Sequence, residues 1–105
     1  MKTNSKFRIT DGKGFQISFE NGLTISVQFG YGNYCANKNE PINSHSANNK
    51  CRDAEIAIFP TEGKDSAWLT NKFLPKKRGE DVVGWIKPDE VAKLIGRVQR
   101  SKILF

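Results

Sequence analysis

The sequence lacks most of the patterns that signal catalysis, metal binding or membrane insertion. Among 105 residues it has a single histidine, His45, and two cysteines, Cys35 and Cys51. No apolar run approaches the ~20 residues that a membrane-spanning helix needs, and "MKTNSKFRIT" has no apolar segment typical of a secretory signal. We therefore expect a cytoplasmic protein with no membrane partner, built as a single domain over residues 1–105 because this length is too short for two cores.

The cysteines bracket an Asn-rich segment, residues 36–50, that contains His45. Two thiols and one imidazole fall one ligand short of a structural zinc site, and the cysteine spacing matches no standard zinc finger. A disulfide would stabilise the loop, but cytosolic thiols are normally kept reduced. We expect no metal, no cofactor, and two free, mostly buried thiols at the base of the loop.

Acid–base catalysis has little support in the sequence. His45 has no Ser or Cys motif placed for it, and the acid pairs Glu80-Asp81 and Asp89-Glu90 suit a strand entry and a helix start. We do not expect an enzyme.

What the sequence does contain is a clear β-hairpin. Alternating apolar side chains, all at odd positions, are Phe15, Ile17, Phe19, Leu23, Ile25, Val27 and Phe29. A two-residue turn at Asn21-Gly22 would pair these with polar residues of the other strand. We therefore predict a three-residue connection over 20–22, with Gly22 in the left-handed region and Ile17 opposite Ile25.

Further strands are predicted at 54–59, 67–70 and 81–86, each bounded by turn residues. Over 87–102 the period changes: Pro88 suits the first helical position, and an apolar stripe follows at Val91, Leu94, Ile95 and Val98. The predicted fold class is α+β, an antiparallel sheet of four or five strands with the C-terminal helix packed on its apolar face.

The hairpin runs into "FGYGNYC", which is the first candidate site. Tyr31 and Tyr34 could stack on a planar group while Asn33 offers an amide, and the flanking glycines allow close approach of a ligand. The alternative is structural, with the glycines forming a bulge and the tyrosines covering an edge of the core. If the site exists, a concave surface lined by these three residues is expected.

The polar face of the hairpin is unusual because it carries no charge. Its members are Gln16, Ser18, Thr24, Ser26 and Gln28, whereas an ordinary solvent face would include Lys or Glu. We predict that something covers it: a partner, the long loop or a second copy of the chain. The alternative is that Ser and Thr occur on this face simply because of their β-propensity.

The chain is basic, with a net charge of +6. Two candidate basic surfaces are the "PKKR" segment and the outward face of the helix, that is Lys76, Lys77, Arg78, Lys93, Arg97 and Arg100. Such surfaces attract nucleic acid or an acidic protein, although they also serve simply to keep a small protein soluble.

The segments "GFQISFENGLTISVQFGYGNYC", "AEIAIF" and "GWIKPDEVAKLI", in this order, resemble a group of small uncharacterised proteins encoded by bacteriophages and prophages. The resemblance implies a protein that acts inside a bacterial host cell. We expect a non-enzymatic binding module, an antagonist that binds and blocks a host defence protein. Alternative roles are nucleic-acid binding through the basic helix face and sequestration of a nucleotide-like ligand at Tyr31 and Tyr34; self-association is a further alternative.

Overall fold

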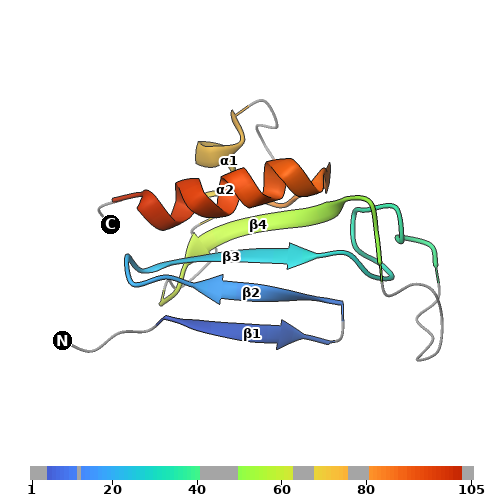
Figure 1. Ribbon diagram of the computed structural model, residues 1–105, viewed down its shortest axis with the longest axis horizontal. Coiled ribbons are helices and arrows are strands. Elements are labelled where there is room, and N and C mark those ends of the chain that lie inside the picture. Colours follow the sequence, from blue (N-terminus) through green and yellow to red (C-terminus); the bar gives the residue numbers. More distant parts are fainter. Residues whose placement is uncertain (1–4, 12, 41–49, 63–67, 76–80, 103–105) are drawn as a thin grey trace.

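The computed structural model describes residues 5–11, 13–40, 50–62, 68–75 and 81–102. Its centre is a five-stranded antiparallel sheet whose spatial order, β1-β2-β3-β4-β5, is also the chain order (Figure 1). The strands are β1 (Lys6–Thr10), β2 (Gly14–Ser18), β3 (Leu23–Gln28), β4 (Ala54–Pro60) and β5 (Val83–Ile86).

The predicted hairpin register is confirmed. In the β2–β3 pair, Ile17 lies opposite Ile25. The N–H of Phe19 donates to the carbonyl of Leu23 at 2.8 Å, and Gly22 adopts a φ of 90°. The left-handed glycine absorbs the extra residue of the turn, so the apolar residues of both strands share one face.

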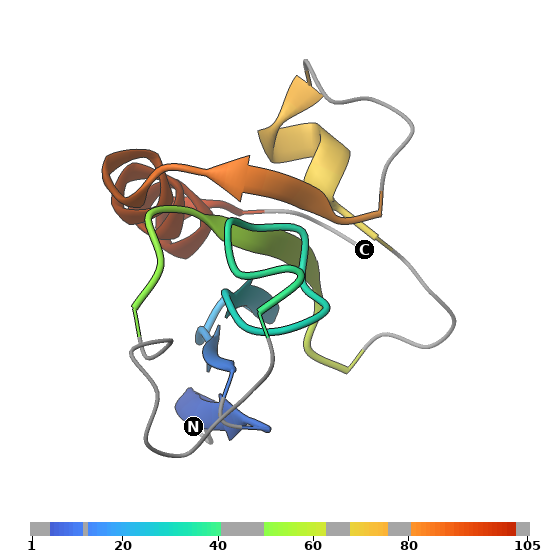
Figure 2. The same ribbon diagram turned by 90° about the vertical axis from the view of Figure 1, so that its right-hand side faces the viewer.

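Helix α2 (Pro88–Arg100) covers that apolar face, as Figure 2 shows. Pro88 opens the helix, and Asp89 and Glu90 occupy the first turn, where acidic side chains complement the helix dipole. Its buried residues are Val91, Leu94 and Val98, and Ile95 packs partly buried beside them. The predicted α+β arrangement is therefore confirmed.

The strand predicted at 67–70 is wrong over residues 68–70, and Ala67 lies outside the described residues. Thr70 instead begins a short helix, α1 (Thr70–Phe73). The reason is a side chain that replaces a strand backbone: the Thr70 hydroxyl accepts from the N–H of Ile58 at 3.0 Å and donates to the carbonyl of Asp81 at 2.7 Å. Pairing of β4 with β5 ends at Ile56, and beyond it the Thr70 hydroxyl and the N–H of Leu69, which donates to the carbonyl of Ile58 at 2.8 Å, satisfy the backbone of Ile58. Strand β5 (Val83–Ile86) is shorter than the predicted 81–86.

Strand β1 was not predicted and supplies the fifth strand. It pairs with β2 and lies at the side of the sheet farthest from α2 (Figure 1). Phe7 and Ile9 point to the same face as their partners Ile17 and Phe15, but α2 does not reach them, and they are 80% and 82% exposed. One sheet edge is thus apolar and uncovered.

Asn21 joins the hairpin turn to the end of α2. Its side-chain amide donates to the carbonyls of Val98 and Ser101, both at 2.8 Å, and its carbonyl oxygen accepts from the N–H of Leu23 at 3.0 Å. The carbonyls at the C-terminal end of a helix lack partners within the helix. Asn21 therefore caps α2 from a distant part of the chain.

Within the described residues, no helix is both long and apolar enough to span a membrane.

Candidate functional site

Two exposed aromatic rings meet at the end of the sheet opposite the hairpin turn. Tyr34, from the loop after β3, stacks on Trp85 of β5 with ring centroids 5.8 Å apart and planes 14° apart. Both rings remain accessible, at 43% for Tyr34 and 53% for Trp85. Large aromatic side chains that stay accessible together are typical of interaction surfaces.

Trp85 holds an unfavourable backbone conformation. Its φ is 57°, in the left-handed region that bulky residues rarely adopt. The conformation is fixed because the N–H of Trp85 donates to the carbonyl of Tyr34 at 2.9 Å. Close packing at Gly84 adds to this, since a Cβ there would lie 2.5 Å from the Cβ of Tyr34. Strain of this kind tends to persist where the strained residue has a function.

Asn33, which the sequence analysis offered as a ligand-binding amide, is engaged within the fold. Its amide nitrogen donates to Glu55 at 3.0 Å, and its oxygen accepts from the N–H of Gly30 at 3.1 Å. The other carboxylate oxygen of Glu55 accepts from the N–H of Tyr34 at 3.1 Å. Asn33 and Glu55 therefore position Tyr34 and present little to a ligand.

Tyr31 is half exposed, and its backbone carbonyl accepts from Lys13 Nζ at 3.0 Å. The structure thus joins Tyr34 to a residue that sequence reasoning missed, Trp85. The two lie 51 positions apart in sequence, and the one local signal was the Gly84-Trp85 pair inside a predicted strand. We call Tyr31, Tyr34 and Trp85 the aromatic surface.

The uncharged face of the hairpin is largely occupied by its own contacts. Ser18 and Ser26 are buried, and the hydroxyls of Ser18 and Thr24 lie 2.9 Å apart. Gln28 donates to the Ser26 hydroxyl at 3.1 Å. Of the five residues on this face, Gln16 and Gln28 are the ones that stay partly accessible.

The basic helix face is also partly engaged. Lys93, Arg97 and Arg100 are exposed as predicted. However, Arg97 donates to the carbonyl of Phe73 at 3.1 Å, and its guanidinium lies over that ring. Arg97 therefore anchors α1 to α2. Lys76, Lys77, Arg78 and His45 lie outside the described residues.

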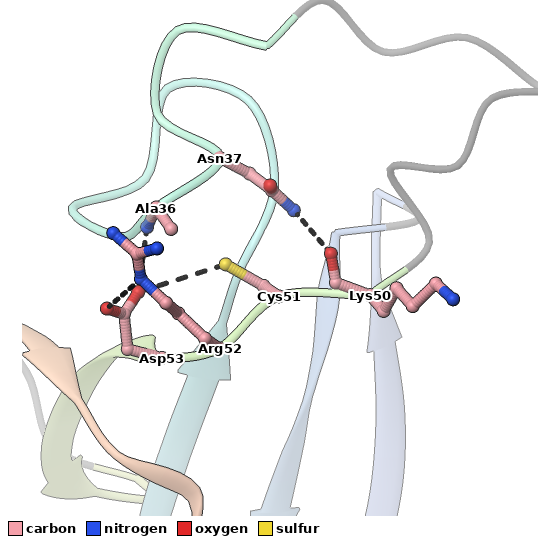
Figure 3. A network of polar contacts seen from close by, with 6 residues as sticks. All are labelled: Ala36, Asn37, Lys50, Cys51, Arg52 and Asp53. Atoms are coloured by element: carbon pink, nitrogen blue, oxygen red, sulfur yellow. Dashed lines mark hydrogen bonds and ion pairs between the residues drawn. The ribbon is translucent and has the colours of Figure 1, made fainter.

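Both cysteines are free, as expected, with Cys35 buried and Cys51 partly buried. An acidic side chain that the sequence analysis did not connect with them lies beside them: Cys51 Sγ is 3.8 Å from Asp53 Oδ1 (Figure 3). The ligand atoms of Cys35, Cys51 and Asp53 all lie within 4.8 Å of one another. Asp53 also accepts from the N–H of Ala36 at 2.7 Å. Within the part of the chain that the structure describes, these three residues form the group that could hold a metal ion.

The pKa of the Cys35 thiol is raised from 9.0 to about 11, chiefly because the thiol is buried. A hydrogen bond with the Asn37 backbone lowers the pKa, and Cys51 and Asp53 contribute to the rise. Removing water destabilises the thiolate relative to the thiol. Because the unfolded thiol ionises near 9.0, the stability contribution is present below that pH and is lost as the pH rises through 11.

We predict that iodoacetamide modifies Cys51 well before Cys35 in the reduced, metal-free protein at pH 8. With a pKa of about 11, Cys35 would be ionised in about one molecule in a thousand at that pH, and only the thiolate reacts. Peptide mass spectrometry at successive times measures both rates, and the same reaction in denaturant should bring them together. Equal rates in the folded protein would contradict the prediction.

A pocket of about 280 Å³ lies between α2 and the sheet, next to this cluster. Its walls are mostly apolar, and Cys51 and Asp53 contribute polar atoms; other lining residues include Phe15, Phe29, Pro88 and Ile95. None of its lining residues belongs to the aromatic surface.

Comparison of the chain with protein families, with curated proteins and with solved structures found no match.

Proposed function

We propose that the protein is a non-enzymatic binding module that contacts a protein partner through the aromatic surface. The observation that carries the proposal is Trp85: an accessible tryptophan, stacked on Tyr34, in a left-handed backbone conformation that the surrounding contacts maintain. Tyrosine and tryptophan are the residues most enriched among those that dominate binding energy at protein interfaces.

The geometry favours a protein over a planar small molecule. Tyr34 and Trp85 already stack on each other, so a base or similar ring would find no slot between them. The amide of Asn33, the nearest candidate for reading the edge of a base, is engaged with Glu55 and Gly30. A protein surface can cover the stacked rings of Tyr34 and Trp85 together.

The resemblance to phage and prophage proteins makes a bacterial host protein the partner that we propose. A host defence component is the leading choice, and the protein would act as an antagonist that blocks it.

The test is an affinity pull-down from bacterial lysate, with and without nuclease, using wild type and two matched variants. Trp85→Gly removes the ring and also relieves the left-handed strain, so we expect the unfolding free energy to change by less than about 1 kcal/mol. Phe7→Ser removes a still more accessible ring from β1. We expect a defined host protein to be captured by wild type and Phe7→Ser, and to be lost with Trp85→Gly, regardless of nuclease.

Two outcomes would contradict the proposal. Capture that survives Trp85→Gly but fails with Phe7→Ser would place the partner on β1. Nuclease-sensitive capture that Lys93→Gln with Arg100→Gln abolishes would identify nucleic acid as the partner, because these two cations are the exposed helix residues outside the Arg97–Phe73 contact.

A further inference from the structure

We propose that Cys35, Cys51 and Asp53 form a binding site for a thiophilic divalent cation of the zinc class. This inference is independent of the aromatic surface. It also reverses the expectation drawn from the sequence, which counted two thiols and His45 and gave Asp53 no role.

The spacing of the three groups fits one metal ion. With zinc–sulfur and zinc–oxygen bonds of about 2.3 and 2.1 Å, the ligand atoms of a tetrahedral site lie roughly 3.5 to 3.8 Å apart. Cys51 Sγ and Asp53 Oδ1 are 3.8 Å apart, and all three ligand atoms fall within 4.8 Å of one another. Side-chain shifts of about 1 Å at most therefore complete the geometry.

The donor set selects the class of metal. Two thiolates with one carboxylate suit zinc and similar borderline-soft cations, whereas magnesium and calcium require oxygen ligands. Three protein ligands leave one coordination position, which water can take. Because Cys51 and Asp53 also line the apolar pocket, a small donor molecule could approach the cation from that side.

The loop is held in place for this arrangement by contacts outside the ligand set. Asn37 is buried, and its amide donates to the carbonyls of Phe29 at 3.0 Å and Lys50 at 3.1 Å, which ties the Cys35 segment to the Cys51 segment. Figure 3 shows Asn37 and Ala36 facing the 50–53 segment. The N–H of Ala36 donates directly to the proposed ligand Asp53 at 2.7 Å, and a hydrogen bond of this kind orients a ligand and typically strengthens metal binding.

A cation at this position would also compensate the burial of Asp53. Its side chain is 5% exposed, and the ion pair found for it in the described part of the chain is with Arg52, at 3.9 Å, whose own side chain is 79% exposed. A long ion pair with a solvated guanidinium compensates little of the cost of burying a carboxylate. A divalent cation between Asp53 and the thiols would compensate it directly.

The experiment is a titration of the reduced, metal-free full chain with Co²⁺, followed by displacement with Zn²⁺. We expect one equivalent of Co²⁺ to bind, with a thiolate-to-cobalt charge-transfer band that Zn²⁺ removes. Asp53→Asn preserves shape and can still accept from Ala36, so the fold should persist while Co²⁺ affinity falls at least tenfold. Cys51→Ser, at a partly exposed position, should reduce the charge-transfer band.

Arg52→Gln is the matched control, since it removes a neighbouring cation but keeps all three ligands. We expect its Co²⁺ affinity to equal or exceed that of wild type. Absence of the band in wild type would overturn the proposal. So would an affinity that Asp53→Asn leaves unchanged, or a mass that shows the thiols joined in a disulfide after incubation with the metal under reducing conditions. Circular dichroism of each variant verifies that it is folded.

Discussion

Replacing Asn21 with Asp is expected to lower the free energy of unfolding by about 3 kcal/mol, a large share of the stability of a small domain. The substitution removes the amide that donates to the carbonyls of Val98 and Ser101. It also places a carboxylate against carbonyl oxygens at the negative end of the α2 dipole. Asn21→Ala, which loses the hydrogen bonds without adding charge, should cost less, about 2 kcal/mol. Urea denaturation followed by circular dichroism measures both.

Gln99→Asp is the control for charge alone. It places a carboxylate at an exposed position in the last turn of α2 and leaves the Asn21 cap in place. We expect it to cost less than about 1 kcal/mol. If Gln99→Asp were as damaging as Asn21→Asp, or if Asn21→Ala had no effect, the cap would not stabilise the helix.

Replacing Thr70 with Val is the second substitution with a large expected effect, also about 3 kcal/mol. Valine has nearly the same shape, so no cavity forms, but the completely buried hydroxyl is lost. The N–H of Ile58 then lies in the core without its acceptor, and the carbonyl of Asp81 loses its donor. An unsatisfied buried donor costs more than the hydrogen bond itself contributes.

Thr70→Ser distinguishes the hydroxyl from the packing of its methyl group. Serine keeps both hydrogen bonds and removes one methyl, so a loss of about 1 kcal/mol is expected. Thermal denaturation of the two variants provides the comparison. Equal destabilisation by Val and Ser would show that packing rather than hydrogen bonding matters at this position.

The predictions that succeeded rest on patterns contained within single segments. The odd-numbered apolar positions fixed the partner of Ile17, and the 3.6-residue stripe defined α2. The strand prediction at Thr70 failed because Thr70 contacts Ile58 of β4, 12 positions earlier, through its side chain and not through strand pairing of its backbone. Strand β1 was missed since Phe7 and Ile9 form a short run with charged neighbours.

The candidate sites show the same limit more strongly. Tyr34 was identified from its own segment, but its partner Trp85 belongs to β5. The residues next to Trp85 in the sequence do not indicate that its φ is left-handed. Asp53 becomes a candidate ligand only when the fold brings Cys35 beside it. Contacts between distant segments decide both sites, and single-sequence periodicity does not report them.

The agreement between strand order and chain order has a consequence for how the molecule forms during synthesis. Each strand pairs with the one made just before it, so the meander can grow as the chain leaves the ribosome. The loops that join β1 to β2 and β2 to β3 are short, whereas β4 and β5 each pair only after a long connection, 29–53 and 61–82, has been made. The helix that shields Leu23 and Ile25 is made after all five strands. Until α2 docks, the nascent sheet presents its apolar face to other chains, and docking of α2 with its Asn21 cap is the step that ends this exposure.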